Sequence, residues 1–151
     1  MKFTPSKLNR FTFFKLPAAW WCGVRVISLE ESKCVVGVRY RWINQNPFRS
    51  MFWAVQGMAA ELSTGVLIMN SIQQSDKKAS MLLINTQGNF TKKARGKITF
   101  ICTAGQEVRA KLQTLFEKKG TTTFWLQSKG IDENGETVAT FDFEWSILIK
   151  E

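Results

Sequence analysis

The feature that most constrains this chain is a long segment with almost no charge. Between Arg49 and Asp76 the only charged residue is Glu61. Within residues 51–70 apolar side chains recur in steps of three and four, which is the period of a helix, and the opposite side is also small or apolar. The apolar stripe consists of Phe52, Val55, Ala59, Leu62, Val66 and Met69. A helix that is apolar on all sides is a buried helix, so this segment predicts a buried central helix.

The single carboxylate in this helix needs a physical reason. A carboxylate buried without a partner is costly, and no cation stands one or two turns from Glu61. One interpretation is a catalytic or ligand-orienting acid, because functional groups are often tuned by burial. The other is a glutamate that is hydrogen-bonded across an interface or at a helix edge. The pattern alone leaves both interpretations open.

Length and composition narrow the class of protein. A chain of 151 residues, of which 44% are hydrophobic, is expected to form one domain over residues 1–151, with 1–20 as a helical extension. The absence of histidine removes most zinc and iron sites, and the three cysteines have no metal-binding spacing. The odd cysteine count favours a reducing, cytoplasmic location. Polar residues within 51–70 argue against a membrane span.

The charge balance predicts an anionic partner. The chain has 21 Lys and Arg residues against 12 Asp and Glu, a formal net charge of +9. No nucleic-acid-binding module is recognisable, so nucleic acid is not expected as a partner. Most of the cations are scattered, as on an ordinary solvated surface. One group is concentrated in the sequence and consists of Lys92, Lys93, Arg95 and Lys97.

Alternating apolar and polar residues predict the strands of a sheet. Strands are expected at 24–29, 34–42, 80–87, 96–103, 121–129 and 136–150, and further helices at 6–16, stopped by Pro17, and at 106–119. The second strand is expected to place Val36, Val38, Tyr40 and Trp42 on one face. Asn134 and Gly135 form a strong hairpin turn signal. This order predicts an α+β fold in which an antiparallel sheet wraps around one long helix.

Two sequence blocks resemble a known family. The first is Asn46-Pro-Phe-Arg-Ser-Met-Phe-Trp-Ala-Val-Gln-Gly-Met-Ala-Ala-Glu61-Leu-Ser-Thr-Gly65, with an Asn before the helix and an acid about two turns into it. The second is Asn89-Phe-Thr-Lys-Lys-Ala-Arg-Gly96, an aromatic residue followed by basic residues. Together, in this strand order, they resemble the hotdog-fold thioesterases, and most closely an uncharacterised branch of that superfamily.

The resemblance implies a site at a dimer interface that hydrolyses an acyl-CoA thioester. Glu61 would activate water or attack the carbonyl carbon. The backbone N–H of Trp53, with that of Ala54, would bind the carbonyl oxygen, and Asn46 would orient water or the carbonyl. The CoA phosphates would be bound by the second block, through Asn89, Lys92, Lys93 and Arg95. The implied assembly is a homodimer or a dimer of dimers, with a CoA or acyl-carrier thioester as substrate and no separate cofactor or metal.

The family pattern is incomplete at the start of the helix. Active members usually have a Gly-Gly pair there, often after a His, whereas this chain has Phe52-Trp53-Ala54. A glycine lets a ligand approach the backbone closely, and Trp53 removes that freedom. The alternative function is therefore a non-catalytic hotdog module that binds an acyl-CoA or a lipidic acid. A hotdog hydratase is not expected, because its Asp–His pair cannot be built without histidine.

Overall fold

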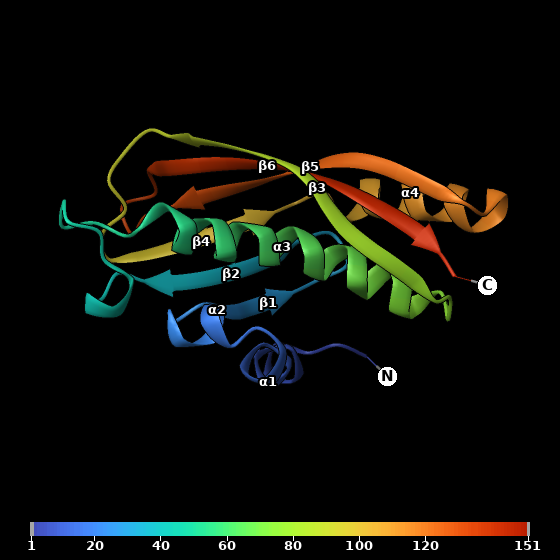
Figure 1. The fold of residues 1–151 in the computed structure, drawn as a ribbon, viewed down its shortest axis with the longest axis horizontal. Helices are drawn as coiled ribbons and strands as arrows, with labels where there is room; N and C mark the ends of the chain where they lie inside the picture. The colour runs from blue at the N-terminus through green and yellow to red at the C-terminus, as the bar shows by residue number, and fades with distance from the viewer. Residues whose placement is uncertain (1, 151) are drawn as a thin grey trace.

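A computed structural model describes residues 2–150 (Figure 1). The helices and strands are, in order, α1 (Pro5–Lys15), α2 (Pro17–Trp21), β1 (Arg25–Leu29), β2 (Cys34–Arg39), the 3₁₀ turn η1 (Trp42–Asn44), α3 (Trp53–Gln74), β3 (Ala79–Phe90), β4 (Lys97–Cys102), α4 (Gly105–Lys118), β5 (Thr121–Ile131) and β6 (Thr137–Ile149). Every helix and strand expected from the sequence is present, with shifted ends. In this described part of the chain, no helix is long and apolar enough to cross a membrane.

The six strands form one sheet in the order β1-β2-β4-β5-β6-β3, and all neighbouring strands are antiparallel. β2 pairs with β4 along its whole length, although α3 and β3 separate them in the chain. The long strands β3, β5 and β6 span much of the length of α3, which lies against the inner face of the sheet (Figure 1). This is the predicted α+β hotdog arrangement, in which the sheet wraps around one central helix.

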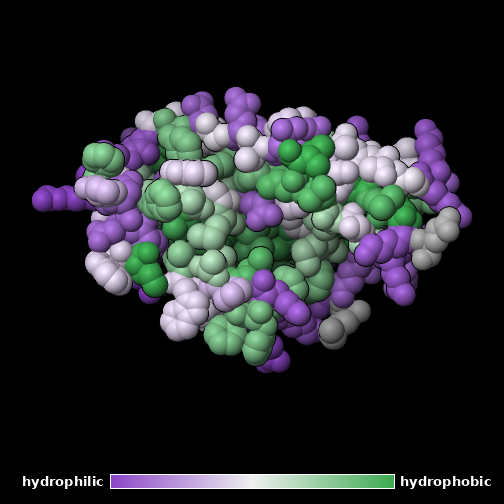
Figure 2. All heavy atoms as spheres, viewed as in Figure 1, coloured by the Kyte–Doolittle hydropathy of each residue, from purple (hydrophilic) through white to green (hydrophobic). Residues whose placement is uncertain are grey.

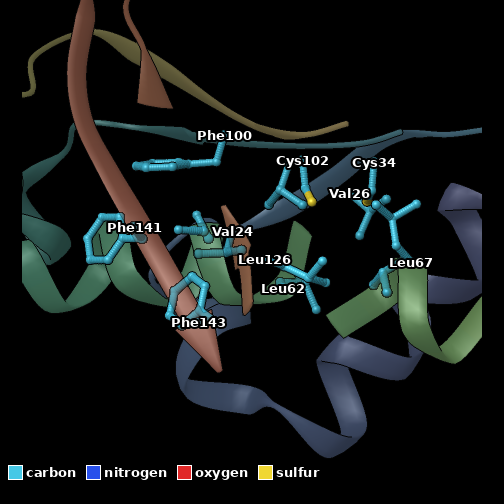
Figure 3. Packing of buried hydrophobic residues seen from close by; sticks show 14 of the residues in the cluster. Val24, Val26, Cys34, Leu62, Leu67, Phe100, Cys102, Leu126, Phe141 and Phe143 are labelled. Carbon is cyan, nitrogen blue, oxygen red and sulfur yellow. The ribbon is translucent and has the colours of Figure 1, made fainter. Parts of the chain in front are cut away.

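The core lies between α3 and the inner face of the sheet. On β6, Phe141, Phe143 and Trp145 are buried and alternate with half-exposed polar residues. The rings of Phe141 and Phe143 stack with their centroids 5.8 Å apart, and Phe100 of β4 meets Phe141 edge-on at 6.1 Å. Figure 3 shows these rings with apolar side chains of α3 in the same cluster. The period-two alternation of β6 therefore turns its aromatic side chains toward the core.

Two polar contacts fix how α3 sits against the sheet. The hydroxyls of Ser63 and Ser128 are fully buried and hydrogen-bonded at 2.7 Å. The indole N–H of Trp145 donates to Thr64 Oγ1 at 3.0 Å. A buried polar group left unpaired would cost about 1–3 kcal/mol, so these pairs favour a single register of the helix on the sheet.

The second strand ends earlier than predicted. β2 stops at Arg39, and Trp42, expected on its inner face, is 82% exposed in η1. The cause is Asn44, whose amide donates to the carbonyls of Cys22 and Arg39, both at 2.9 Å, and accepts from the N–H of Arg41 at 2.8 Å. These hydrogen bonds compete with strand pairing, and a period-two pattern of apolar residues gives no sign of them. The inward placement of Trp42 was therefore wrong.

As expected, α1 ends just before Pro17, but Pro17 also begins a second helix. It is the first residue of α2, where the missing proline N–H would have no intrahelical partner in any case. α1 is fixed against β1 by Asn9, whose side chain accepts from the N–H of Val26 at 2.8 Å and donates to its carbonyl at 3.0 Å. α1 thus has a defined position beside β1 (Figure 1).

Candidate active site

Two hollows contain most of the side chains singled out by the sequence. The end groove has a volume of about 630 Å³ and lies at the N-terminal end of α3. It is lined by Asn46, Pro47, Phe48, Ser50, Met51, Phe52, Trp53, Gln56, Phe90, Thr91, Lys92, Lys93 and Ala94. The α1 chamber has a volume of about 260 Å³ and contains Glu61. The structure therefore brings Asn46 and Trp53 together with the two lysines and places Glu61 in a separate hollow.

Asn46 shapes the loop that leads into α3. Its Oδ1 accepts from the N–H of Phe48 at 2.9 Å and from the N–H of Ser50 at 3.3 Å. Its Nδ2 donates to Ser50 Oγ at 3.0 Å and to the carbonyl of Met51 at 3.4 Å. Because these bonds occupy both ends of the amide, Asn46 has a structural function in the turn. Its role in orienting water or substrate stays a prediction.

The start of α3 presents backbone donors without acceptors. Phe52, at the N-cap position, makes no capping bond with its side chain, and among residues 2–150 the N–H groups of Trp53 and Ala54 have no acceptor. Such donors, together with the helix dipole, form a region of partial positive charge. The Trp53 side chain is 57% exposed and contacts Phe52 edge-on, so it does not fill the interior of the protomer.

Gln56 is a residue that the sequence analysis missed as a site candidate. It lies on the first turn of α3, lines the end groove and is only 4% exposed. Its Nε2 donates to the carbonyl of Met51 at 3.3 Å, whereas its buried Oε1 has no partner within residues 2–150. A buried acceptor without a donor is costly and can be satisfied by a ligand or water. The available signal was a polar residue within an otherwise apolar segment.

The α1 chamber is mostly apolar. Its walls come from α1, α3, β3 and β6, and they consist of Leu8, Phe11, Thr12, Lys15, Leu16, Glu61, Leu62, Gly65, Val66, Met69, Met81 and Trp145. Figure 2 shows apolar side chains gathered over the middle of this face, with polar side chains around its rim. A partly open apolar hollow with two ionisable groups on its wall has the composition of a small-molecule site.

Glu61 is half-buried, so the full burial expected from the pattern is only partly realised. No hydrogen bond or ion pair reaches its carboxylate from the described residues. Burial raises the pKa of the Glu61 carboxyl, because desolvation disfavours its charged form. Its backbone carbonyl accepts from Thr64 Oγ1 at 2.8 Å, and this hydroxyl accepts from Trp145. The backbone beneath the carboxylate is therefore held while the carboxylate itself is unpaired.

The predicted phosphate-binding residues differ in how far they are already engaged. Lys92 pairs with Asp132 at 2.9 Å and with Glu136. The hydrogen bonds that Lys92 donates to Glu136 and to Asp132 raise the pKa of Lys92. Lys93 Nζ lies 3.4 Å from the carbonyl of Phe48 and has no carboxylate partner in the described part of the chain. Of these two lysines, Lys93 is therefore the more available to an anion.

Arg95 and Asn89 lie outside the lining of the end groove. Arg95 Nε donates to the carbonyl of Arg49 at 3.0 Å, which leaves its other guanidinium N–H groups free for a ligand. Asn89 is exposed on β3, opposite Thr140 of β6. No cluster of His, Cys, Asp or Glu side chains that could hold a metal ion is found within residues 2–150.

Comparison with known proteins identifies the family of this chain. Residues 5–147 match the family described as Domain of unknown function (DUF4442), and the chain belongs to this family. The match includes α1. No curated protein matches the sequence.

Several solved structures share the fold over nearly the whole chain. A Pseudomonas aeruginosa protein of unknown function, named a probable thioesterase, has 22% identity and a TM-score of 0.83, with 99% of each chain covered. A Chlorobaculum tepidum protein of unknown function has 19% identity and a TM-score of 0.84, covering 97% of this chain and 98% of its own. A Haemophilus influenzae thioesterase has 13% identity and a TM-score of 0.74, with coverages of 99% and 93%. At these identities the likeness shows the fold.

Proposed function

We propose that the protein hydrolyses acyl-CoA thioesters, with Glu61 as the group that activates water or attacks the carbonyl. The observation that carries this proposal is the unpaired Glu61 carboxyl, with a raised pKa, on the wall of an apolar chamber. A general base is most effective when its pKa lies near the working pH, and burial moves a carboxyl in that direction. The thioesterase names of several proteins with this fold support the same reaction class.

The active site is proposed to need two subunits. Trp53 and Glu61 are eight residues apart on α3, which separates them by roughly 12 Å along the helix axis. A reacting carbonyl must lie about 3 Å from both the base and the oxyanion donor, so one helix cannot supply both. We therefore pair Glu61 of one protomer with the N–H of the partner subunit's Trp53. The substrate would then lie across the interface.

The proposed homodimer uses the free edge of the sheet. β3 is an edge strand that pairs only with β6, and Leu82 and Ile84 on it are 64% and 41% exposed. A long exposed apolar edge favours pairing with another strand. On α3 a half-exposed stripe of Ala54, Gly57 and Met58 leads to Glu61 and would let a second helix approach closely. In a dimer of dimers, each dimer would form through this same interface of β3 and α3.

The proposed reaction is a simple acyl transfer to water. Ionised Glu61 removes a proton from a water molecule as the water oxygen attacks the thioester carbonyl carbon. The developing oxyanion is stabilised by the N–H groups at the start of the partner's α3. The tetrahedral intermediate then expels the CoA thiolate, which takes the proton from Glu61. If Glu61 attacks directly, the same donors serve, and water later cleaves the acyl–Glu anhydride.

The end groove is proposed to bind the polar half of the substrate. Asn46 and Gln56 supply polar atoms near the thioester, and Lys93, Arg95 and, more weakly, Lys92 meet the phosphates of CoA or of an acyl carrier, with Asn89 at the margin. Lys92 contributes less because two carboxylates already neutralise it. We infer a cytoplasmic location, which agrees with three unpaired cysteine thiols.

A second candidate is a hotdog module that binds an acyl-CoA or a lipidic acid without hydrolysing it. The observation that favours it is Trp53-Ala54 in place of the Gly-Gly pair of active relatives. A side chain at this position restricts how closely a thioester can approach the helix backbone. This candidate uses the same hollows and the same dimer.

Release of free thiol from a panel of acyl-CoAs tests the proposal. For the best substrate, Glu61→Gln should lower the hydrolysis rate about a hundredfold or more, because the base is lost while shape is kept. Binding of a non-hydrolysable acyl-CoA analogue should persist, and the melting temperature should hold or rise. Glu117→Gln, at an exposed site on α4, is the matched control and should change none of these. If the wild-type protein releases no thiol and the Glu61→Gln variant is destabilised, the hydrolase proposal is rejected and the non-catalytic binding module remains.

A further inference from the structure

The α1 chamber has features that hydrolysis alone does not require. α1 closes one side of it with Phe11 and Leu16, and Leu8 and Thr12 of the same helix are 2% and 1% exposed. α1 therefore packs as a fixed wall and not as a loose flap. Apart from Thr12, Lys15 and Glu61, every lining residue is apolar. Such a space suits a hydrocarbon better than a charged or hydrogen-bonding group.

The position of Glu61 relates the chamber to the thioester. A carbonyl that reacts at Glu61 lies at the wall of the chamber, and the acyl chain beyond that carbonyl must enter some apolar space. The end groove is lined by lysines and polar loop atoms and suits the CoA half instead. The two halves of an acyl-CoA therefore match the two hollows in polarity.

We propose that the α1 chamber receives the aliphatic tail of the acyl group and that α1 limits the length of tail that fits. This inference rests on the proposed acyl-CoA function. The chamber belongs to a single protomer, whereas the oxyanion donors belong to the partner. Tail selection and catalysis are therefore separable by mutation.

The walls favour an aliphatic tail over an aromatic ring. Met69 and Met81 contribute flexible thioether side chains, and Leu62 and Val66 contribute branched aliphatic ones. Methionine adapts to irregular apolar ligands because its side chain has three rotatable bonds. A chain of methylenes can follow such walls, while a rigid ring needs one flat slot.

Gly65 lies where a side chain would compete with the ligand. It lines the chamber on α3, and a Cβ built there would lie 3.4 Å from the ring of Trp145, an ordinary contact. A larger side chain at this position is therefore expected to be accommodated by taking up chamber volume. Leucine also has a better helix propensity than glycine, which helps the variant to fold.

The test measures binding along a series of saturated acyl groups. Non-hydrolysable thioether analogues of acyl-CoA, from acetyl to palmitoyl in two-carbon steps, are titrated by calorimetry. Free fatty acids of the same lengths are competed against cis-parinaric acid, which reports tail binding without CoA. In both series, affinity should rise by up to about fourfold per methylene until the chamber is full, and then level off. A phenylacetyl analogue should bind more weakly than the best aliphatic one.

Three variants decide whether this plateau belongs to the chamber. Gly65→Leu should move it to shorter tails, and Phe11→Ala, which opens the α1 wall at a 40% exposed residue, should move it to longer tails. Leu112→Ala removes a buried side chain of α4 outside the chamber and is the matched control. It should lower the melting temperature and leave the plateau unchanged.

The outcomes separate this inference from the proposed function. If the plateau shifts in opposite directions in the two chamber variants but no thiol is released, tail binding in the chamber is supported and the proposed hydrolysis is ruled out. If thiol is released but affinity does not depend on tail length, or neither variant moves the plateau, tail binding in the chamber is ruled out and the proposed hydrolysis stands. Preference for the aromatic analogue, or no binding in either series, also overturns the chamber proposal.

Discussion

The end groove and the α1 chamber differ in both construction and chemistry. The groove is formed by the loop before α3 and the loop after β3, and it offers backbone donors, amides and lysines. The chamber is formed by helices and strands, and its walls are apolar except at Thr12, Lys15 and Glu61. Loops can place many polar atoms at little cost in packing, whereas an acid between packed elements has a shifted pKa. Neither hollow alone contains all the groups of a thioester hydrolase.

On the proposed mechanism, one α3 helix would carry two half-sites. Its first turn supplies donors to the groove, and Glu61, eight residues later, supplies an acid to the chamber. A two-fold axis would bring the first turn of one helix beside the acid of another. Variants that disable one half-site at a time test this arrangement.

The largest expected effect comes from removing a single backbone N–H. Trp53→Pro deletes this donor at the first helical position, where proline is tolerated, and Phe52 has φ −59° and ψ 132°, which suits a residue before proline. We expect kcat to fall about 10²–10³-fold, as when one oxyanion donor is lost. Trp53→Ala also removes the ring but keeps the N–H, and it should retain most of the activity. Stopped assays of thiol release, with melting curves for both variants, make the measurement.

Equal loss of activity in the alanine and proline variants would contradict the assignment of the N–H. It would mean that the indole ring, and not the backbone, is what the site requires. A gain of activity in Trp53→Ala with loss in Trp53→Pro would show that the ring restricts access of the thioester to the helix backbone.

The second prediction tests whether the two half-sites meet across the interface. Trp53→Pro and Glu61→Gln chains are co-expressed with different tags, and the heterodimer is purified. Each heterodimer would have one of its two sites with both groups intact, so the purified heterodimer should recover roughly half of wild-type activity. Each homodimer alone should be nearly inactive. A heterodimer as inactive as its parents, or a wild-type protein that is monomeric by light scattering, rules out the shared site.

The fold was largely predictable because it depends on periodicity. The apolar segment around Glu61 predicted the central helix, and the alternation of apolar and polar residues predicted the last strand. The early end of β2 was not predictable in this way, because it depends on the hydrogen bonds of Asn44 to Cys22 and Arg39. Such side-chain-to-backbone bonds leave no periodic trace in a sequence.

The site was predictable only as a set of residue types. Spacing placed Glu61 within an apolar helix but not inside a chamber roofed by α1, since α1 is distant in the chain. The charge pattern singled out Lys92, whose pairing with Asp132 and Glu136 arises from a neighbouring hairpin. Gln56 was overlooked because its importance comes from burial without a partner, which only coordinates reveal.

The third prediction concerns pH and is specific to the chamber. Because burial raises the pKa of Glu61, kcat/KM should increase by up to about tenfold per pH unit over a window above the usual pKa of glutamate. A raised folded-state pKa contributes stability that is present at low pH and lost as pH rises through it. The melting temperature of Glu61→Gln should therefore exceed that of wild type increasingly as pH rises. A rate independent of pH below neutrality would remove Glu61 as the base.

The smallest expected effect concerns the cations beside the groove. Lys93→Gln combined with Arg95→Gln should weaken acyl-CoA binding only several-fold at low salt, because exposed ion pairs are each worth about 0–1 kcal/mol. The loss should shrink as salt is raised, since exposed charges are screened. Lys92→Gln is the matched comparison and should change affinity less, because its charge is already used by Asp132 and Glu136. Titration calorimetry with CoA and with dephospho-CoA measures the affinity of the double variant and of Lys92→Gln. If Lys92→Gln weakens binding more than the double variant does, the ligand breaks the ion pairs of Lys92 with Asp132 and Glu136, and Lys92 itself is part of the site. If neither variant changes affinity at low salt, the cluster is ordinary surface and the groove holds CoA through its backbone donors and amides.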